Sequence, residues 1–187
     1  MAVQRPTSSR RSSSKTRAVR VVVVTGTVGV GKSTVGHALA ERAAQRGASA
    51  AFLDVDELSR LWPAPVGDPF RTGLILTNLR AITGNYEAAG ASLLVLAWAI
   101  QDAEDLTRLE AAVGASVRAI RLCAPAAVID ARLRQRHHGA ESDGLAWHIR
   151  RAPELLAIQD HGLRGLPMVA AGGQVAEVAD AVLRLLD

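Results

Sequence analysis

Residues 26–33 combine glycines with a lysine and a serine in an order suited to binding phosphate. They read Gly-Thr-Val-Gly-Val-Gly-Lys-Ser, which satisfies the pattern G-x-x-x-x-G-K-[ST]. Four valines run into the first glycine, and a helical pattern begins at the lysine. In such a strand–turn–helix unit, the backbone N–H groups and the helix N-terminus point at an anion. The pattern therefore predicts a nucleotide phosphate site.

The last two residues of this pattern have distinct expected roles. Lys32 is expected to reach the β- and γ-phosphates, and the Ser33 hydroxyl to ligate Mg²⁺. A glycine-rich turn that binds no ligand would not need Lys-Ser at its end, so ATP or GTP binding is the favoured interpretation. The loop residues predicted to bind the nucleotide are Gly26, Thr27, Val28, Gly29, Val30, Gly31, Lys32, Ser33 and Thr34.

Two carboxylates, Asp54 and Asp56, follow the second predicted strand. One could hold Mg²⁺ and the other could accept a proton from a substrate hydroxyl. Because the two acids alternate along an expected extended segment, their side chains are predicted to point to different sides. An alternative interpretation is that one of them only caps the short helical turn that follows.

The order of these motifs resembles the small-molecule kinase group of the shikimate, gluconate and adenylylsulfate kinases and chloramphenicol phosphotransferase. The resemblance rests on the phosphate loop followed by Phe-Leu-Asp-Val-Asp-Glu-Leu-Ser-Arg at 52–60, and covers 19–187 in motif order. It implies that Asp56 contacts the substrate hydroxyl and that Asp54 lies nearer the metal. In the adenylylsulfate kinases the first acid is the favoured base, so the assignment within the pair stays open.

Arginines precede a polar loop after the fourth predicted strand. Arg132 and Arg136 are four residues apart and share a helix face. The resemblance implies that they belong to a short lid near 132–143 and neutralise phosphate charge during transfer. In related enzymes such an arginine contributes about 10³-fold or more in rate. A solvated basic helix is the alternative interpretation.

The acceptor pocket is expected around the proline-rich segment 62–69 and the helix that follows it. The residues predicted to contact the acceptor there are Arg60, Trp62, Phe70, Arg71 and Arg80. The stretch Asn-Leu-Arg at 78–80 resembles a substrate-contacting helix of the adenylylsulfate kinases. Trp147 is expected to pack inside the protein and His148 to lie on the surface.

The chain departs from the kinase group at two strand ends. The strand at 92–97 ends without an acidic residue, and Asp54 is expected to replace it as the metal ligand. The last strand lacks the polar stretch that the group often has. Gly173 is nevertheless expected to contact adenine through its backbone, and Arg132 completes the predicted nucleotide site.

Strand and helix patterns alternate from residue 19 to the end of the chain. Strands are expected at 19–25, 50–53, 92–97, 117–122 and 167–170. Helices are expected at 32–46, 72–89, 102–113, 126–136, 145–158 and 175–186, with interruptions near Gly84 and Pro153. This order predicts a three-layer α/β P-loop NTPase fold with a five-stranded parallel sheet. Ligands of such sheets bind beyond the carboxyl ends of the strands.

Charge separates residues 1–18, predicted to be a disordered basic tail, from a kinase domain at 19–187. The chain has 22 basic and 18 acidic residues, but 1–20 hold six basic residues and no acid. The remaining 16 basic residues are fewer than the acidic ones, which argues against a basic nucleic-acid binder. No apolar run reaches membrane-spanning length, and the protein is expected to be cytoplasmic.

These features predict an ATP- and Mg²⁺-dependent phosphotransferase that acts on a hydroxyl group of a small molecule. One alternative is a polynucleotide-end kinase, which the acidic balance and the missing aromatic stacking platform disfavour. Another is a non-catalytic nucleotide-binding regulatory module, which would tolerate loss of both Asp54 and Asp56. The sequence leaves open the acceptor, the preference between ATP and GTP, and the oligomeric state.

Overall fold

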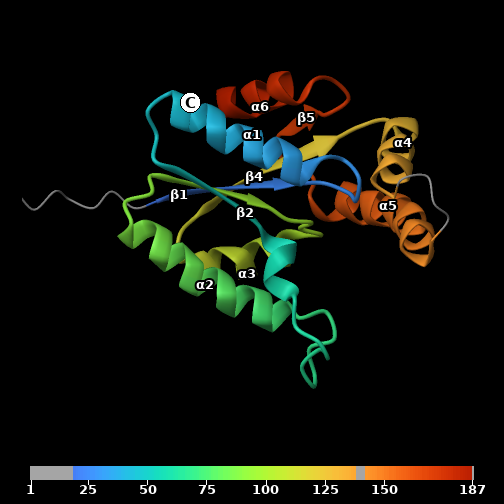
Figure 1. The fold of residues 1–187 in the computed structure, drawn as a ribbon, viewed down its shortest axis with the longest axis horizontal. Coiled ribbons are helices and arrows are strands. Elements are labelled where there is room, and N and C mark those ends of the chain that lie inside the picture. The colour runs from blue at the N-terminus through green and yellow to red at the C-terminus, as the bar shows by residue number, and fades with distance from the viewer. Residues whose placement is uncertain (1–18, 138–141, 187) are drawn as a thin grey trace, which may run out of the picture.

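All five strands of the computed structural model pair in parallel in one sheet, in the order β2-β3-β1-β4-β5 (Figure 1). The model describes residues 19–137 and 142–186. The strands are β1 (Arg20–Thr25), β2 (Ala50–Asp54), β3 (Leu93–Ala97), β4 (Val117–Cys123) and β5 (Met168–Ala170). The helices are α1 (Lys32–Gln45), η1 (Val55–Ser59), α2 (Thr72–Ala88), α3 (Ala103–Val113), α4 (Ala126–Arg136), α5 (Asp143–Gly162) and α6 (Val175–Arg184). The predicted fold is confirmed.

Alternation along the strands divides the core between the two faces of the sheet. In β1, Val22 and Val24 face a cluster that includes α1 and α6. Val21 and Val23 face the opposite cluster, which includes α2 and α3. Because β1, β3 and β4 are buried along most of their length, both faces of the sheet need a covering layer of helices. Figure 1 shows these two helix pairs on opposite sides of the sheet.

The remaining helices, α4 and α5, pack together at the carboxyl edge of the sheet (Figure 1). A separate apolar cluster centred on Ile129, Leu133, Leu145 and Ala152 joins them. Val28 of the phosphate loop packs against the same cluster. The loop that follows β1 therefore rests on α4 and α5 and cannot be placed independently of them.

A buried hydrogen bond connects the phosphate loop to α5. The Thr27 hydroxyl donates to the Ala152 carbonyl at 2.6 Å, and Thr27 is 2% exposed. Within a helix that carbonyl would normally receive an N–H from residue 156 as well. The Thr27 hydroxyl thus links the phosphate loop specifically to α5 at the carboxyl edge of the sheet.

Element bounds differ from the predicted ones by a few residues, most at α5. This helix starts two residues earlier than predicted, because the Ser142 hydroxyl caps it by accepting from the Leu145 N–H at 3.1 Å. It also continues through Pro153, so the predicted interruption there is wrong. Likewise α2 runs unbroken through Gly84.

Two predicted segments fall partly or wholly outside the described residues: the basic tail 1–18, and 138–141 of the lid. Among the residues that the structure describes, no helix is both long and apolar enough to cross a membrane.

Thr27→Val tests the link between the phosphate loop and α5. Valine keeps the shape but removes the hydroxyl, so we expect a loss of about 1–3 kcal/mol in the free energy of unfolding. Thr77→Val is the matched control, because its hydroxyl bonds to Gly73 within α2 at an exposed site. Urea denaturation of both variants measures the difference. Equal stabilities would contradict the structural role of Thr27.

Candidate active site

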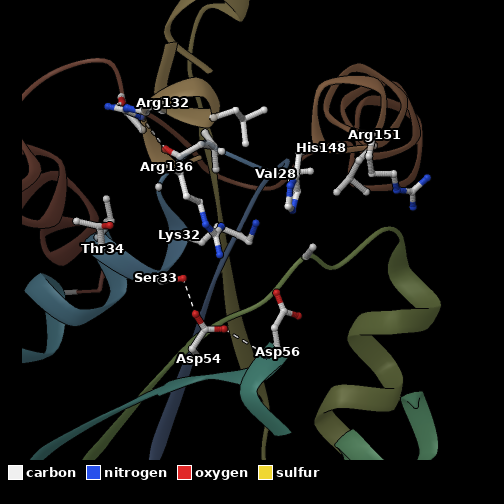
Figure 2. Close-up of a pocket in the computed structure, with 18 of the residues that line it drawn as sticks. Val28, Lys32, Ser33, Thr34, Asp54, Asp56, Arg132, Arg136, His148 and Arg151 are labelled. Atoms are coloured by element: carbon white, nitrogen blue, oxygen red, sulfur yellow. Dashed lines mark hydrogen bonds between the residues drawn. The ribbon is translucent and has the colours of Figure 1, made fainter. Parts of the chain in front are cut away.

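A cleft of about 800 Å³ opens at the carboxyl edge of the sheet. The phosphate loop and the start of α1 form one side, and the end of β2 with η1 forms the base (Figure 2). The helices α4 and α5 form the far side. All five of the side chains predicted to be catalytic line this cleft, although they come from three separate parts of the chain.

The glycines of the phosphate loop are required by close packing as well as by backbone conformation. Gly29 has φ +78°, and a Cβ there would lie 2.8 Å from Leu133 of α4. Gly26 has φ +140°, and a Cβ there would lie 2.7 Å from the Leu122 carbonyl. Both positions therefore exclude any larger residue. Residues 28–34 line the cleft, whereas Gly26 and Thr27 lie behind it.

Lys32 carries a positive charge into a site that water reaches poorly. Its Nζ donates to the Thr27 carbonyl at 3.1 Å. Burial lowers the pKa of Lys32 below its usual 10.5, and the Arg136 charge lowers it further. Asp56 and Asp54 oppose this shift but do not cancel it. A bound phosphate would supply the missing negative charge, so the site favours an anion.

Ser33 and Asp54 form the pair expected at a magnesium site. The Ser33 Oγ donates to Asp54 Oδ2 at 2.6 Å (Figure 2). Hydroxyl and carboxylate oxygens are ligands that Mg²⁺ prefers, so these two residues fit the ion. Within 19–137 and 142–186, no group of three or more His, Cys, Asp or Glu could hold a metal. An ion here would therefore depend on phosphate oxygens and water for its other ligands.

Asp54 also caps the helix that carries Asp56. Its Oδ1 accepts from the Asp56 backbone N–H at 3.2 Å, which places Asp54 at the end of β2 and Asp56 in η1. The prediction of an extended segment at Asp56 is wrong, because this cap starts a 3-10 turn immediately after the strand. The capping interpretation is confirmed for Asp54 through Oδ1, while Oδ2, which bonds to Ser33, is the oxygen left for the predicted metal.

Asp56 lines the cleft at an exposed position, where the cleft walls partly screen its carboxyl from water. Burial raises the pKa of the Asp56 carboxyl above its usual 3.8, and the nearby Asp54 charge adds to the shift. The Lys32 and Arg136 charges act in the opposite direction. The net effect makes Asp56 a stronger proton acceptor than a solvated aspartate.

The two predicted lid arginines differ in what they contact. Arg132 donates to the Val30 carbonyl at 2.9 Å and to the Ala171 carbonyl at 2.8 Å, which ties the phosphate loop to the segment after β5. Arg136 lies over Lys32 and influences its pKa (Figure 2). Arg136 therefore faces the phosphate site, whereas Arg132 supports its backbone. Gly173 lines the cleft on the Arg132 side.

The residues predicted to contact the acceptor do not line this cleft. Arg60 pairs with Glu57, and Arg71 bonds to the Leu61 carbonyl and stacks over Trp62. Trp62 and Phe70 are 71% and 84% exposed. Arg80 is exposed on α2. The proline-rich segment projects away from the sheet edge instead of folding over it (Figure 1).

Residues of α5 take the place expected for that segment. Trp147, His148 and Arg151 line the cleft, together with Gln101 after β3. The sequence interpretation missed them because it expected Trp147 in the interior and His148 on the surface. Their spacing of three and four residues on a helix was the available signal, since such residues share one face.

Comparison with known proteins agrees with this geometry. The model of the AAA domain family (AAA_33) matches residues 21–151. The chain belongs to this family. The match begins in β1, contains the whole phosphate loop and both acids, and ends in α5 at Arg151. A search of curated protein sequences found no match.

Solved structures with the same fold include several small-molecule kinases. A gluconokinase from Sinorhizobium meliloti 1021 is 21% identical, with a TM-score of 0.60 over 91% of this chain and 94% of that one. The tunicamycin resistance protein of Deinococcus radiodurans is 21% identical, with a TM-score of 0.63 over 90% and 95%. The APS kinase of Mycobacterium tuberculosis is 22% identical, with a TM-score of 0.57 over 90% and 98%. At these identities the similarity establishes the fold.

Lys32→Met tests whether the phosphate loop binds nucleotide. Loss of a charge-assisted contact worth about 1.5–3 kcal/mol is expected to weaken ATP binding by about 10- to 100-fold. Because burial already disfavours the Lys32 charge, the free energy of unfolding should not decrease. Calorimetric titration and urea denaturation measure the two effects, with Arg42→Met, which pairs with Asp180 away from the cleft, as the control for ATP affinity. Unchanged ATP affinity would refute the phosphate site.

Proposed function

We propose that the protein is an ATP- and Mg²⁺-dependent phosphotransferase that phosphorylates a hydroxyl group of a small molecule. The observation that carries this proposal is the meeting of Lys32 and Asp56 in one cleft, close enough for each to shift the pKa of the other. A cation that fits phosphates and a carboxylate that fits a hydroxyl proton then lie on either side of one reaction centre. The kinase names of the structural relatives support the same reaction class.

In this mechanism the donor phosphates lie against the loop amides and Lys32. The acceptor hydroxyl donates a hydrogen bond to Asp56, whose raised pKa suits it to take the proton as the new O–P bond forms, while the bond from the γ-phosphorus to the bridging oxygen breaks and ADP leaves. Mg²⁺ held by Ser33 and Asp54 would neutralise charge on the phosphate oxygens. Arg136 would stabilise the transferring group, since it faces Lys32 across the phosphate site (Figure 2). Positioning and charge stabilisation account for most of the rate.

The two alternatives differ from this proposal in the role of Asp56 and in the surface beside the cleft. A regulatory module would bind nucleotide without needing Asp56. A polynucleotide-end kinase would need a basic strand-binding surface beside the cleft, whereas Asp56 and Glu57 give its base acidic character. A polynucleotide-end kinase would use the phosphate loop and Asp56 in the same way, so the acidic base of the cleft is what favours a small-molecule acceptor.

Replacing each acid by its amide separates the two roles. Asp54→Asn keeps an N-cap and should weaken the apparent affinity for Mg²⁺. Asp56→Asn should leave magnesium dependence nearly unchanged and lower phosphoryl transfer by about 10²-fold or more, the scale of a lost general base. Turnover across a magnesium series measures both. Identical profiles for the two variants would mean that the acids act as one metal site.

Arg136→Ala tests the charge contact over the phosphates. A contact made mainly in the transition state lowers kcat more than it raises the KM for ATP. Arg134→Ala on the same helix is the matched control, because Arg134 pairs with Asp130 and does not line the cleft. If steady-state kinetics of the two variants coincide, Arg136 is a surface residue without a catalytic role.

A further inference from the structure

Two histidines meet on the α5 side of the cleft. His148 Nδ1 lies 3.2 Å from His137 Nε2, and His137 Nδ1 lies 3.3 Å from the Ser142 Oγ. Trp147 packs edge-on against the His148 ring. Figure 2 shows the His148 ring pointing from α5 into the cleft, on the side where Asp56 lies. Two neighbours, His137 and Trp147, therefore hold the His148 imidazole in a defined orientation, and Ser142 in turn holds His137.

These contacts determine which ring nitrogen of His148 is left for a ligand. The ring also bonds to the backbone of Gly144, one helical turn earlier. A carbonyl can only accept, and Nδ1 is the ring nitrogen nearest to the chain's own backbone, so Nδ1 carries the proton. The same proton position suits the His137 Nε2 as an acceptor. Nε2 of His148 is then an unprotonated acceptor with no partner among the described residues.

The surroundings also keep the imidazole neutral. Burial lowers the pKa of His148 below its usual 6.5, and Arg136 and His137 on the adjoining helix lower it further, against the effect of Gly144. Arg151 on the same face of α5 and Lys32 on the loop side of the cleft add positive charge, while Asp54, Asp56 and Glu57 are the carboxylates that line it. A neutral ring keeps the lone pair of Nε2 available near neutral pH.

The cleft thus offers two separate hydrogen-bond acceptors, the Asp56 carboxylate at its base and His148 Nε2 on its α5 side. We propose that His148 binds the acceptor by accepting a hydrogen bond from a second hydroxyl group, so that the substrate is a polyhydroxylated compound. This inference rests on the proposed function. The reacting hydroxyl lies at Asp56, and the second hydroxyl lies at His148 Nε2.

The other residues of this wall suit the same class of compound. Gln101 and Arg151 line the cleft, and Arg151 Nη2 donates to Gln101 Oε1 at 3.4 Å. Their remaining N–H groups can donate to hydroxyl oxygens. Trp147 is 52% exposed and adds an apolar ring surface. Hydroxyl groups both donate and accept, and a carbon skeleton can pack on a flat ring. A mono-alcohol would leave His148 and these donors unpaired.

The test measures phosphate transfer from γ-labelled ATP to matched compounds. One set is polyhydroxylated (inositol, gluconate and a methyl glucoside), and the other has a single hydroxyl (cyclohexanol and 6-hydroxyhexanoate). Transfer is expected to members of the first set only. His148→Phe should raise the acceptor KM by about 3- to 10-fold, the loss of one neutral hydrogen bond, while the Kd for Mg-ATP stays the same.

Two further variants separate binding from packing. His148→Gln keeps an accepting oxygen and should restore part of the lost affinity, and His161→Phe, exposed at the far end of α5, should behave as wild type. For wild type, acceptor kcat/KM should rise with pH through a titration below 6.5, since imidazolium cannot accept a hydrogen bond. His148→Phe should lose this titration and keep only the rise that comes from deprotonation of the Asp56 carboxyl, whose pKa is raised above 3.8.

The outcomes distinguish the inference from the function on which it rests. Equal transfer to mono-alcohols, or an acceptor KM that His148→Phe does not change, would overturn the role of His148 and leave the kinase intact. Absence of transfer to every compound, with Mg-ATP bound, would overturn the proposed phosphotransferase and the inference together.

Discussion

A desolvated lysine charge at the end of the phosphate loop is the constraint on which the rest of the site depends. Burial works against the Lys32 ammonium, and the two carboxylates opposite compensate only in part. The loop that precedes Lys32 is held in one conformation, because Gly29 packs closely against Leu133 and the Thr27 hydroxyl bonds to α5. An anion that enters this position therefore meets donors that are already fixed, which lowers the cost of ordering them on binding.

The same constraint explains why the acids lie where they do. Asp54 uses one oxygen for Ser33 and the other to start η1, so a single side chain sets both the proposed cation site and the position of Asp56. The raised pKa of Asp56 and the lowered pKa of Lys32 have a common cause in burial. Burying these charged groups lowers the free energy of unfolding, a cost that is usual at sites arranged for chemistry.

The sequence predicted those parts of the site that short-range residue patterns determine, and it missed those that depend on tertiary packing. The phosphate loop and the parallel sheet follow from glycine spacing and from strand–helix alternation, which are short-range patterns. The α5 side of the cleft cannot be predicted in this way, because His148 reaches the cleft only through the packing of α5 on α4. The proline-rich segment was placed near the acceptor by resemblance, yet Trp62 and Phe70 are exposed away from the cleft. Arg132 also showed the right spacing but bonds to backbone carbonyls.

The most direct measurement is a crystal structure of the protein with Mg²⁺ and a non-hydrolysable ATP analogue. We expect the terminal phosphate beside Lys32 and facing Asp56, with the metal at the Ser33 hydroxyl and Asp54 within reach of its water ligands. The adenine should lie on the Arg132 and Gly173 side of the cleft. A nucleotide bound elsewhere, or a terminal phosphate directed away from Asp56, would contradict the proposal that this cleft transfers phosphate to a hydroxyl group.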